Sequence, residues 1–332
     1  MTATDWADLA NVLFIGCIIF YALAMFGFAL EYAFDTREAK PEKQKELAAV
    51  GGGSSSDADT PPKDHQPANA AVPITPATAR LAGRFSLIFA YAGTILLWIS
   101  IVMRTWASGR WPWGNMFEFT IGMAAVGMVT WLVLVARKQV PRRHSLFATF
   151  AVTIALGLSV RVYTEAGPIE PALDSYWIVI HVTAAVVASG IFLVGFVFAV
   201  MHLMKRRYDR LISEGKTPGF LIKLARDMAD TDRLERLTFK MHVLAFPLWT
   251  FSILAGSLWA HLAWGRYWAW DPKEVWAFAA WVVYAAYLHA RVSGKSARMW
   301  APWLAVIGWA VVLFNLFAVN LIFPGLHSYA GV

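Results

Sequence analysis

Long apolar runs separated by polar segments are the main pattern along this 332-residue chain. The runs are about 20 residues long, the length at which an α-helix crosses the hydrocarbon core of a bilayer. They are not the short alternating segments of a transmembrane barrel. The pattern predicts an all-α, polytopic membrane protein of about eight transmembrane helices, at residues 10–32, 84–104, 116–136, 145–162, 175–204, 240–263, 273–291 and 299–323.

Composition and charge agree with a membrane protein. The chain is 58% hydrophobic and 15% charged, whereas soluble domains are about a quarter charged. Of its 29 Lys and Arg residues, 24 lie in four connections, 33–84, 137–144, 205–240 and 291–298. The positive-inside rule makes these connections cytoplasmic, so both termini are predicted to lie outside the cytoplasmic membrane. The net charge of +7 thus follows topology and does not indicate nucleic-acid binding.

The chain is predicted to have three parts. Residues 1–35 form an N-terminal transmembrane helix, and residues 36–80, rich in Ala, Gly, Ser, Pro and Lys, a disordered cytoplasmic linker. Residues 81–332 form the main transmembrane domain. Residues 219–238 are open to two interpretations, an amphipathic helix on the inner leaflet or a solvated basic loop. A single cysteine, Cys17, excludes an internal disulfide and a Cys-x-x-Cys pair.

Six of the seventeen tryptophans lie in the external segment 259–281, whose densest part reads WGRYWAWDPKEVW over 264–276. An interfacial belt that contacts lipid would spread its indoles over all helix ends. Here they gather beside Tyr267 and two cations, Arg266 and Lys273, which favours a floor for a flat aromatic ligand with anionic groups. The Asp-Pro-Lys-Glu sequence at 271–274 is typical of a helix start, with Asp at the N-cap and Glu three residues later.

Four histidines lie close to this segment or inside a predicted span. His181 lies about 10 Å along the fifth predicted helix from its outer end, which begins near Asp174. His327 follows the last helix, and His261 ends the sixth. His289 lies about 27 Å along the seventh helix, near its cytoplasmic end. A flat, apolar, dianionic ligand that requires stacking, cations and two imidazoles is heme.

At these residues the chain resembles the CcsA-type (ResC) cytochrome c assembly proteins of the system II pathway, which are heme-handling membrane proteins. Residues 264–276 match their WWD signature. The sequence RWPWGNMFEF at 110–119 resembles the family's outer loop before the third helix, and LHSY at 326–329 its C-terminal end. Asn115 and Glu118 repeat the helix-cap pattern, which favours a structural role over a loop contact with heme.

The resemblance implies roles for individual residues. His181 and His327 match the two external histidines that ligate the iron of heme b at the WWD segment. His289 matches a histidine within the membrane that holds heme on its way from the cytoplasmic side. The aromatic platform and the cations that face the propionates are expected to be Trp264, Arg266, Tyr267, Trp268, Trp270, Lys273 and Trp276. His261 matches no ligand of the family.

The function implied is that of a heme-binding subunit of a cytochrome c synthase, or heme lyase, complex. It would move heme to the outer face and present it for thioether attachment to Cys-x-x-Cys-His apocytochromes. The expected partners are a CcsB-type (ResB) membrane protein, apocytochrome c, thiol reductant proteins for the client, and lipids. No side chain of this chain is required to act as a nucleophile.

Three other functions stay open on the residues alone. A heme exporter would load heme without raising thioether yield. A resident b-type electron carrier would keep its heme and cycle its redox state independently of cytochrome maturation. An interaction protein whose tryptophans only anchor lipid would be colourless. Two histidines at matching depth disfavour the third alternative, and family resemblance alone separates the first two from a synthase.

Overall fold

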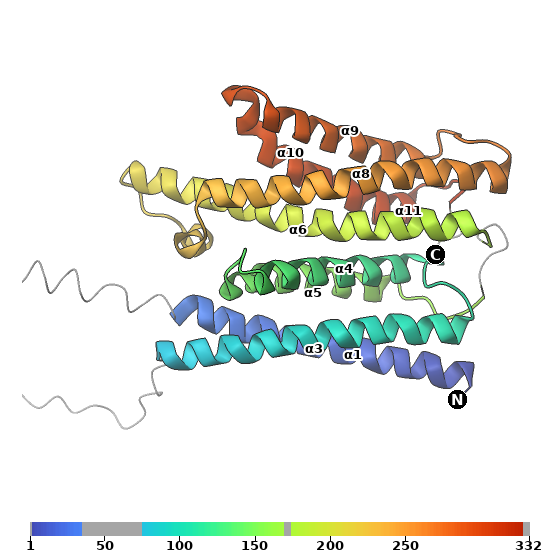
Figure 1. The fold of residues 1–332 in the computed structure, drawn as a ribbon, viewed down its shortest axis with the longest axis horizontal. Coiled ribbons are helices and arrows are strands. Elements are labelled where there is room, and N and C mark those ends of the chain that lie inside the picture. The colour runs from blue at the N-terminus through green and yellow to red at the C-terminus, as the bar shows by residue number, and fades with distance from the viewer. Residues whose placement is uncertain (1, 35–74, 169–173, 328–332) are drawn as a thin grey trace, which may run out of the picture.

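The computed structural model describes residues 2–34, 75–168 and 174–327, and this part of the chain is helical and contains no strand. Its main helices run nearly parallel or antiparallel to one another (Figure 1). They are α1 (Ala3–Phe34), α3 (Pro76–Ser108), α4 (Met116–Ala136), α5 (Ser145–Arg161), α6 (Tyr176–Ser213), α8 (Thr231–Trp264), α9 (Pro272–Val292) and α10 (Lys295–Leu313). Shorter elements are η2 (Arg142–His144), α7 (Phe220–Lys223), η4 (Leu224–Asp227), η5 (Phe314–Ala318) and α11 (Val319–Ile322).

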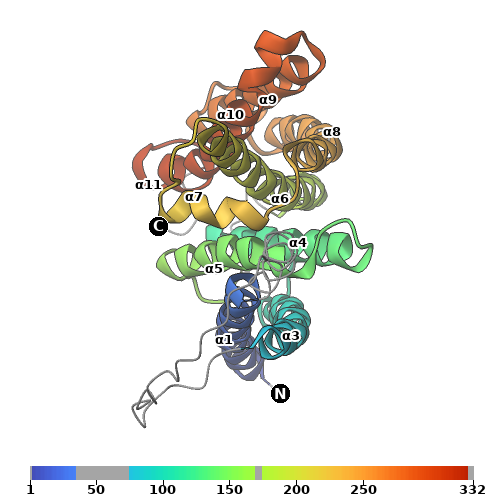
Figure 2. The same ribbon diagram turned by 90° about the vertical axis from the view of Figure 1, so that its left-hand side faces the viewer.

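The helices form three groups across the bundle. Helices α1 and α3 pack as a hairpin on one side, and α4 with α5 form the middle group (Figure 2). Helices α6, α8, α9 and α10 make up the other side, with α6 packed against both α4 and α8. A continuous chain of packing therefore joins the N-terminal hairpin to the C-terminal helices.

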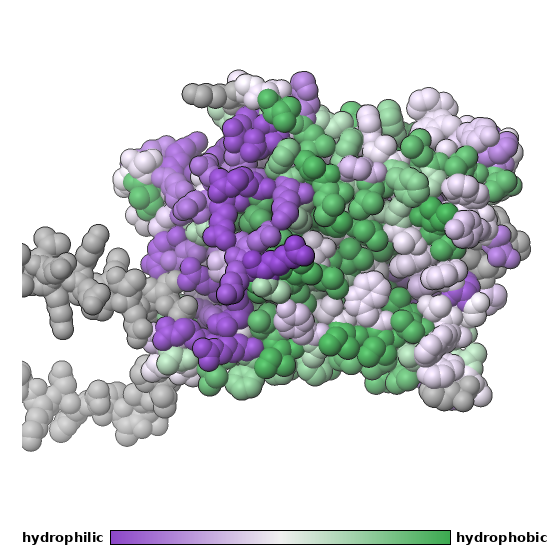
Figure 3. All heavy atoms as spheres, viewed as in Figure 1, coloured by the Kyte–Doolittle hydropathy of each residue, from purple (hydrophilic) through white to green (hydrophobic). Residues whose placement is uncertain are grey.

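Eight helices in the described residues are long and apolar enough to cross a membrane, which confirms the predicted number. The space-filling view shows a broad apolar band with hydrophilic side chains gathered mainly beyond one end (Figure 3). We call this the basic end; it carries the connections 137–141, 214–219 and 293–294. The opposite end carries 109–115, 162–168, 174–175, 265–271 and 323–327, and we call it the tryptophan end.

Several helices extend beyond the apolar runs that predicted them. Helix α3 begins at Pro76, where Thr75 caps it, so its first turns take up residues 76–80 of the predicted linker. Residues 35–74 lie outside the described part of the chain. Helix α8 begins at Thr231, nine residues before the predicted start, and the preceding segment forms only the short α7 and η4. The region 219–238 is therefore not one amphipathic helix.

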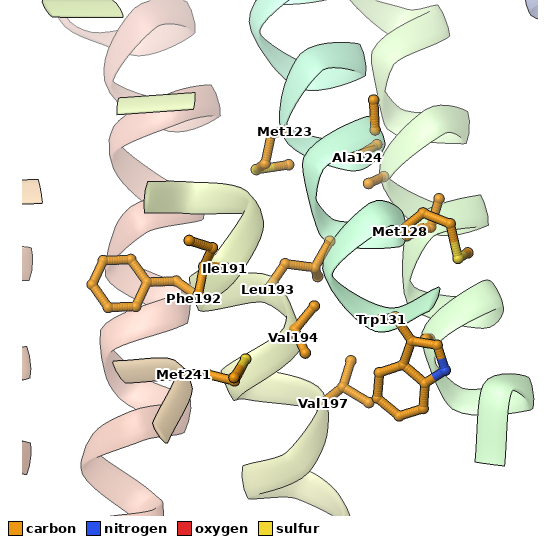
Figure 4. Close-up of a cluster of buried hydrophobic side chains, with 14 of the residues drawn as sticks. Met123, Ala124, Met128, Trp131, Ile191, Phe192, Leu193, Val194, Val197 and Met241 are labelled. Carbon is orange, nitrogen blue, oxygen red and sulfur yellow. The ribbon is translucent and has the colours of Figure 1, made fainter. Parts of the chain in front are cut away.

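The core lies where α4 and α6 cross (Figure 4), and small residues let these two helices approach closely. A methyl group added at Gly190 would lie 2.7 Å from Val126 and 2.8 Å from the carbonyl of Met123. Around this crossing Trp131 stacks on Phe198, with ring centroids 4.9 Å apart. The middle of the bundle is therefore tightly packed, and the space for a ligand lies nearer the tryptophan end.

One turn of π-helix, η5, interrupts the last long helix between α10 and α11. A π-turn contains one more residue than the α-helical turn it replaces and often occurs at functional sites. Here it carries Asn315, a buried side chain that faces the cavity described next.

Candidate ligand-binding site

A largely apolar cavity opens near the tryptophan end, between α4, α6, α8, α9 and η5. Its aromatic lining consists of Trp113, Phe119, Trp249, Trp259, Tyr267 and Trp268. Its polar lining includes Asn115, His181, Ser189, Lys273, Glu274, Asn315 and His327. The structure thus brings both predicted axial histidines to one cavity, together with three residues of the predicted platform, Tyr267, Trp268 and Lys273.

His181 is held by a hydrogen bond to α8. Its Nδ1 donates to the carbonyl of Ser252 at 2.7 Å, and the hydroxyl of Ser252 donates back to the carbonyl of His181 at 3.1 Å. A carbonyl can only accept, so Nδ1 carries the proton and Nε2 has the lone pair that a metal requires. Ser175 caps the helix that carries this histidine, one residue beyond Asp174, near which the helix was predicted to begin.

The position of His181 also depends on a glycine in α8. A methyl group added at Gly256 would lie 2.7 Å from both Cε1 and Nδ1 of the imidazole. Contacts under 3.0 Å do not occur for real Cβ atoms, so only glycine leaves room for the ring in this position. The ring then lies parallel to Trp259, with an interplanar angle of 4°.

His327 is held by the residue that caps α9. Its Nδ1 donates to Asp271 Oδ1 at 2.8 Å, and the backbone N–H of Leu326 donates to Oδ2 at 2.6 Å. Asp271 also accepts from the N–H of Lys273 at 3.0 Å, and Glu274 completes the predicted capping box. Burial alone would raise the pKa of Asp271, but these hydrogen bonds outweigh it and lower that pKa, so the carboxylate stays ionised.

Trp259 joins the two histidines across the cavity. Its ring centroid lies 6.4 Å from that of His181 and 5.7 Å from that of His327. Trp264 packs behind, with its centroid 4.7 Å from Trp259 and 5.0 Å from His327. The two imidazoles therefore lie against one buried indole, although they are 146 positions apart in the sequence.

Other predicted platform residues lie outside the cavity lining. Trp276 packs on Phe314, with centroids 4.3 Å apart, and Arg266 is exposed. Trp270 is 72% exposed and has a φ of 58°, which is unusual for a residue with a bulky side chain. The backbone N–H groups on either side of Trp270, those of Ala269 and Asp271, both donate to one carboxylate oxygen of Glu274, so the cap of α9 fixes this turn.

The two remaining histidines of interest lie away from the cavity lining. His289 is exposed near the basic end of α9, roughly 24 Å along the helix from Lys273. His261 is exposed at the end of α8 and stacks on Tyr267, with centroids 4.2 Å apart. Lys273 donates to Asn320 at 2.7 Å, so its ammonium is held beside the cavity by the last helix.

A second wall of the cavity comes from the loop before α4. Trp113 packs on Gly122, where an added methyl group would lie 2.8 Å from the indole. This loop is held by a buried ion network in which Glu118 accepts from Arg104, from Arg110 and from the N–H of Gly114. Asn115 caps α4 as predicted, but the carboxylate of Glu118 binds these groups instead of closing a capping box.

The sequence did not predict that three further residues lie at the cavity. Trp113, Trp259 and Asp271 all contact the cavity or its histidines, whereas the sequence predicted only a structural cap for Asp271. A signal was present for Trp113, because the aromatic and Gly-containing loop at 110–114 resembles the WWD segment in composition. No local pattern indicates that Asp271 contacts a histidine 56 residues later.

Comparison with known proteins identifies the family. Residues 113–327 match the protein family described as cytochrome C assembly protein. This range begins at the tryptophan of the second wall and ends at His327. The chain belongs to the cytochrome c assembly protein family.

Its relatives make it a CcsA-type member. The chain is 34% identical over 259 residues to the cytochrome c biogenesis protein CcsA of Synechococcus sp. (strain CC9902), a match that covers 71% of this chain and 83% of the relative. The CcsA protein of Guillardia theta is 30% identical over 260 residues, with 72% and 84% covered. This CcsA-type protein is therefore a multi-pass membrane protein with a role in cytochrome c maturation.

A solved structure shares the fold. The cytochrome c heme lyase CcmF superposes with a TM-score of 0.56 over 96% of this chain at 18% sequence identity. The chain spans about half the length of CcmF, since 47% of that protein is covered. At this identity the likeness shows that the helical arrangement of the CcsA-type protein is shared with a heme lyase, and it concerns the fold alone.

Proposed function

We propose that this CcsA-type protein binds heme b in the cavity, with the iron between His181 and His327. The observation that carries the proposal is that both imidazoles lie against Trp259 and that each has its Nδ1 hydrogen-bonded to an acceptor. Metal-ligating histidines characteristically donate their second ring N–H in this way, which fixes the tautomer and leaves Nε2 for the metal. The donor set fits a bis-imidazole iron.

The remaining lining suits the macrocycle. Indole and phenol rings from Trp113, Trp259, Tyr267 and Trp268 offer apolar faces for stacking. The ammonium of Lys273 lies at the cavity and Arg266 lies exposed on the adjoining loop, so we assign both to the heme propionates. Trp264 and Trp276 support the site from behind, and Trp270 presents its ring outward.

In this reaction the protein positions the heme and then releases it to the client. A client segment of the form Cys-x-x-Cys-His approaches from the tryptophan end, which we place outside the cytoplasmic membrane because the opposite end carries the basic connections. Each client thiol adds across a heme vinyl group: sulfur bonds to the carbon next to the ring, and the thiol proton goes to the terminal carbon. This addition has no net redox change. The client therefore has to arrive with reduced thiols, from thiol reductant proteins.

His289 is assigned to heme transfer. Its exposed ring lies near the basic end of α9, where a second membrane protein can cover it. We propose that a CcsB-type (ResB) partner packs on this face, supplies a second ligand to heme that arrives from the cytoplasmic side, and provides the contact with apocytochrome c. Heme would then move along α9 toward the cavity, a distance of roughly 24 Å.

The test is a visible spectrum of the protein purified with its CcsB-type partner, oxidised and reduced. We expect a low-spin bis-imidazole spectrum that weakens in His181→Ala and in His327→Ala and returns with added imidazole. His261→Ala is the matched control, because this exposed histidine lies at the same end but is not itself part of the lining; it contacts the lining only through Tyr267. Unchanged spectra in both ligand variants would contradict the proposed site.

A second measurement distinguishes a synthase from an exporter or a b-type carrier. The thioether yield on a Cys-x-x-Cys-His client is measured for the wild type and for the two ligand variants. A synthase subunit loses thioether yield together with heme in the cavity, and imidazole restores both. Thioether formation that is indifferent to either variant would indicate an exporter or a resident carrier.

A further inference from the structure

The two histidines of the cavity are held in different ways. His181 lies within the 38-residue helix α6, and its ring is packed between this helix, Gly256 and Trp259. His327 follows the end of α11, in a non-helical segment that begins at Phe323. One ligand is thus part of a long packed helix, whereas the other belongs to a short tether at the tryptophan end.

A single carboxylate binds the tether to the rest of the bundle twice. Asp271 accepts from the N–H of Leu326 through Oδ2 and from His327 Nδ1 through Oδ1. The chain passes so close that a methyl group added at Gly325 would lie 2.5 Å from Oδ2. Bonds to an ionised carboxylate are about twice as strong as bonds between neutral groups. Asp271, which is fixed as the N-cap of α9, therefore positions His327 together with the ring contacts of Trp259 and Trp264.

We propose that Asp271 and the tether form a latch, and that His327 is the axial ligand that the histidine of the client replaces. This inference rests on the proposed function, since it assigns different roles to the two ligands of the same iron. Asp271 is a positioning residue: it holds His327 on the iron until the client arrives. His181 stays bound throughout.

The exchange is a substitution at iron without change of oxidation state. With heme in the cavity, the bond from iron to His327 Nε2 would break and a bond from iron to the client imidazole would take its place. His327 belongs to the tether at the tryptophan end, and its side chain is 17% exposed. His181, in contrast, lies where α6 and α8 pack against each other, and its ring is bonded to the carbonyl of Ser252 in α8.

Carbon monoxide provides a probe of the ligand that leaves. It binds ferrous heme by replacing one axial ligand, and its stretching frequency reports the ligand that remains opposite. We expect the carbonyl adduct of the reduced wild type to have the same C–O stretch as the adduct of His327→Ala. The adduct of His181→Ala should absorb at lower frequency, because a carboxylate-bonded imidazole donates more electron density to the iron. A wild-type frequency equal to that of His181→Ala would overturn the proposal.

Two variants test the latch. Asp271→Asn keeps an N-cap residue and an oxygen for His327 but removes the charge. We expect carbon monoxide to bind about tenfold faster, the size of effect that follows when a hydrogen bond to a charged group becomes one to a neutral group. Gly325→Ala should have the same effect by displacing the tether. In a His327→Ala background Asp271→Asn should have no effect on the rate; an equal acceleration there would contradict the latch.

The outcomes separate the two proposals. If neither histidine variant alters the spectrum, the cavity does not hold heme and the proposed function fails. If both variants alter it, but Asp271→Asn shifts the C–O stretch of the otherwise wild-type adduct, His327 remains on the iron opposite the gas. The cavity site then stands and the latch is wrong.

Discussion

Charged residues have different surroundings and different partners at the two ends of the bundle. At the basic end Glu235 pairs with Arg291 and with Arg298, whose side chain is 47% exposed. At the tryptophan end Glu118 is fully buried and binds two arginines, and Asp271 is buried and binds a histidine. The first kind of charge joins the ends of α8, α9 and α10, while the second kind fixes loops around a cavity.

This contrast shows how a membrane protein can build a polar site with few charges. Of the 29 Lys and Arg residues, only five lie outside the four basic connections, and two of them, Arg104 and Arg110, bind Glu118. A buried ion pair contributes little net stability but is costly to break. We therefore expect substitutions at the two ends to differ in size.

The largest effect is expected from Glu118→Ala. It leaves Arg104, which is 1% exposed, without its carboxylate, and breaking a buried pair from one side costs about 3–5 kcal/mol. Thermal unfolding in detergent should shift strongly downward, and Glu118→Gln should fall between this variant and the wild type. An unfolding midpoint equal to that of the wild type would show that the network does not hold the loop of Trp113.

A smaller effect is expected from Gly256→Ala. The added methyl group overlaps the His181 imidazole, and overpacking of this kind costs about 1–3 kcal/mol. We expect heme binding to weaken about tenfold, as measured by heme titration of the apoprotein. Gly157→Ala in α5 is the matched control, because its methyl group would meet nothing within 4 Å. Equal affinities in the two variants would contradict the placement of His181.

At the basic end we expect Glu235→Ala to cost at most about 1 kcal/mol, the upper range for ion pairs that are partly exposed. The unfolding midpoints of Glu235→Ala and Glu118→Ala are measured under the same conditions. The two variants can be compared directly, because each removes one carboxylate that binds two arginines. If Glu235→Ala lowered the stability as much as Glu118→Ala does, charged residues at the two ends would not differ in their contribution to stability.

The smallest effect on the cavity is expected from His289→Ala. With heme added to purified protein, the spectrum of the cavity heme should not change, because His289 lies roughly 24 Å away along α9. In cells that supply heme from the cytoplasm, heme content should fall. A changed spectrum after direct addition of heme would mean that the two positions are coupled.

The sequence predicted the helices well but not their ends. Run length in an apolar chain determines the number of spans, and the eight predicted ranges agree with eight helices. Hydropathy does not detect helical turns that are charged, so the continuation of α6 to Ser213 and the start of α8 at Thr231 were missed. These turns are stabilised by side-chain pairs such as Lys205 with Asp209, which are independent of hydrophobicity.

The site could be predicted in part. Depth along a helix follows from counting residues, and His181 and His327 do meet at one cavity. The partners of these histidines could not be predicted, because Asp271 and Ser252 reach them across helices and no local pattern marks such a contact. For the same reason Glu118, with a cap-like sequence position, is instead the centre of an ion network. The assignment of these residues to heme stays a prediction.

The π-turn at Phe314–Ala318 has a consequence for the deletions that the last helix can accept. Because a π-turn holds one residue more than an α-helical turn, removal of one residue within 314–318 would leave an ordinary α-helical turn. The helix beyond it would keep nearly the same orientation, so Asn320 would still face Lys273. The wide turn that presents Asn315 to the cavity would be lost. One-residue deletions here should thus be tolerated by folding and change the lining of the cavity.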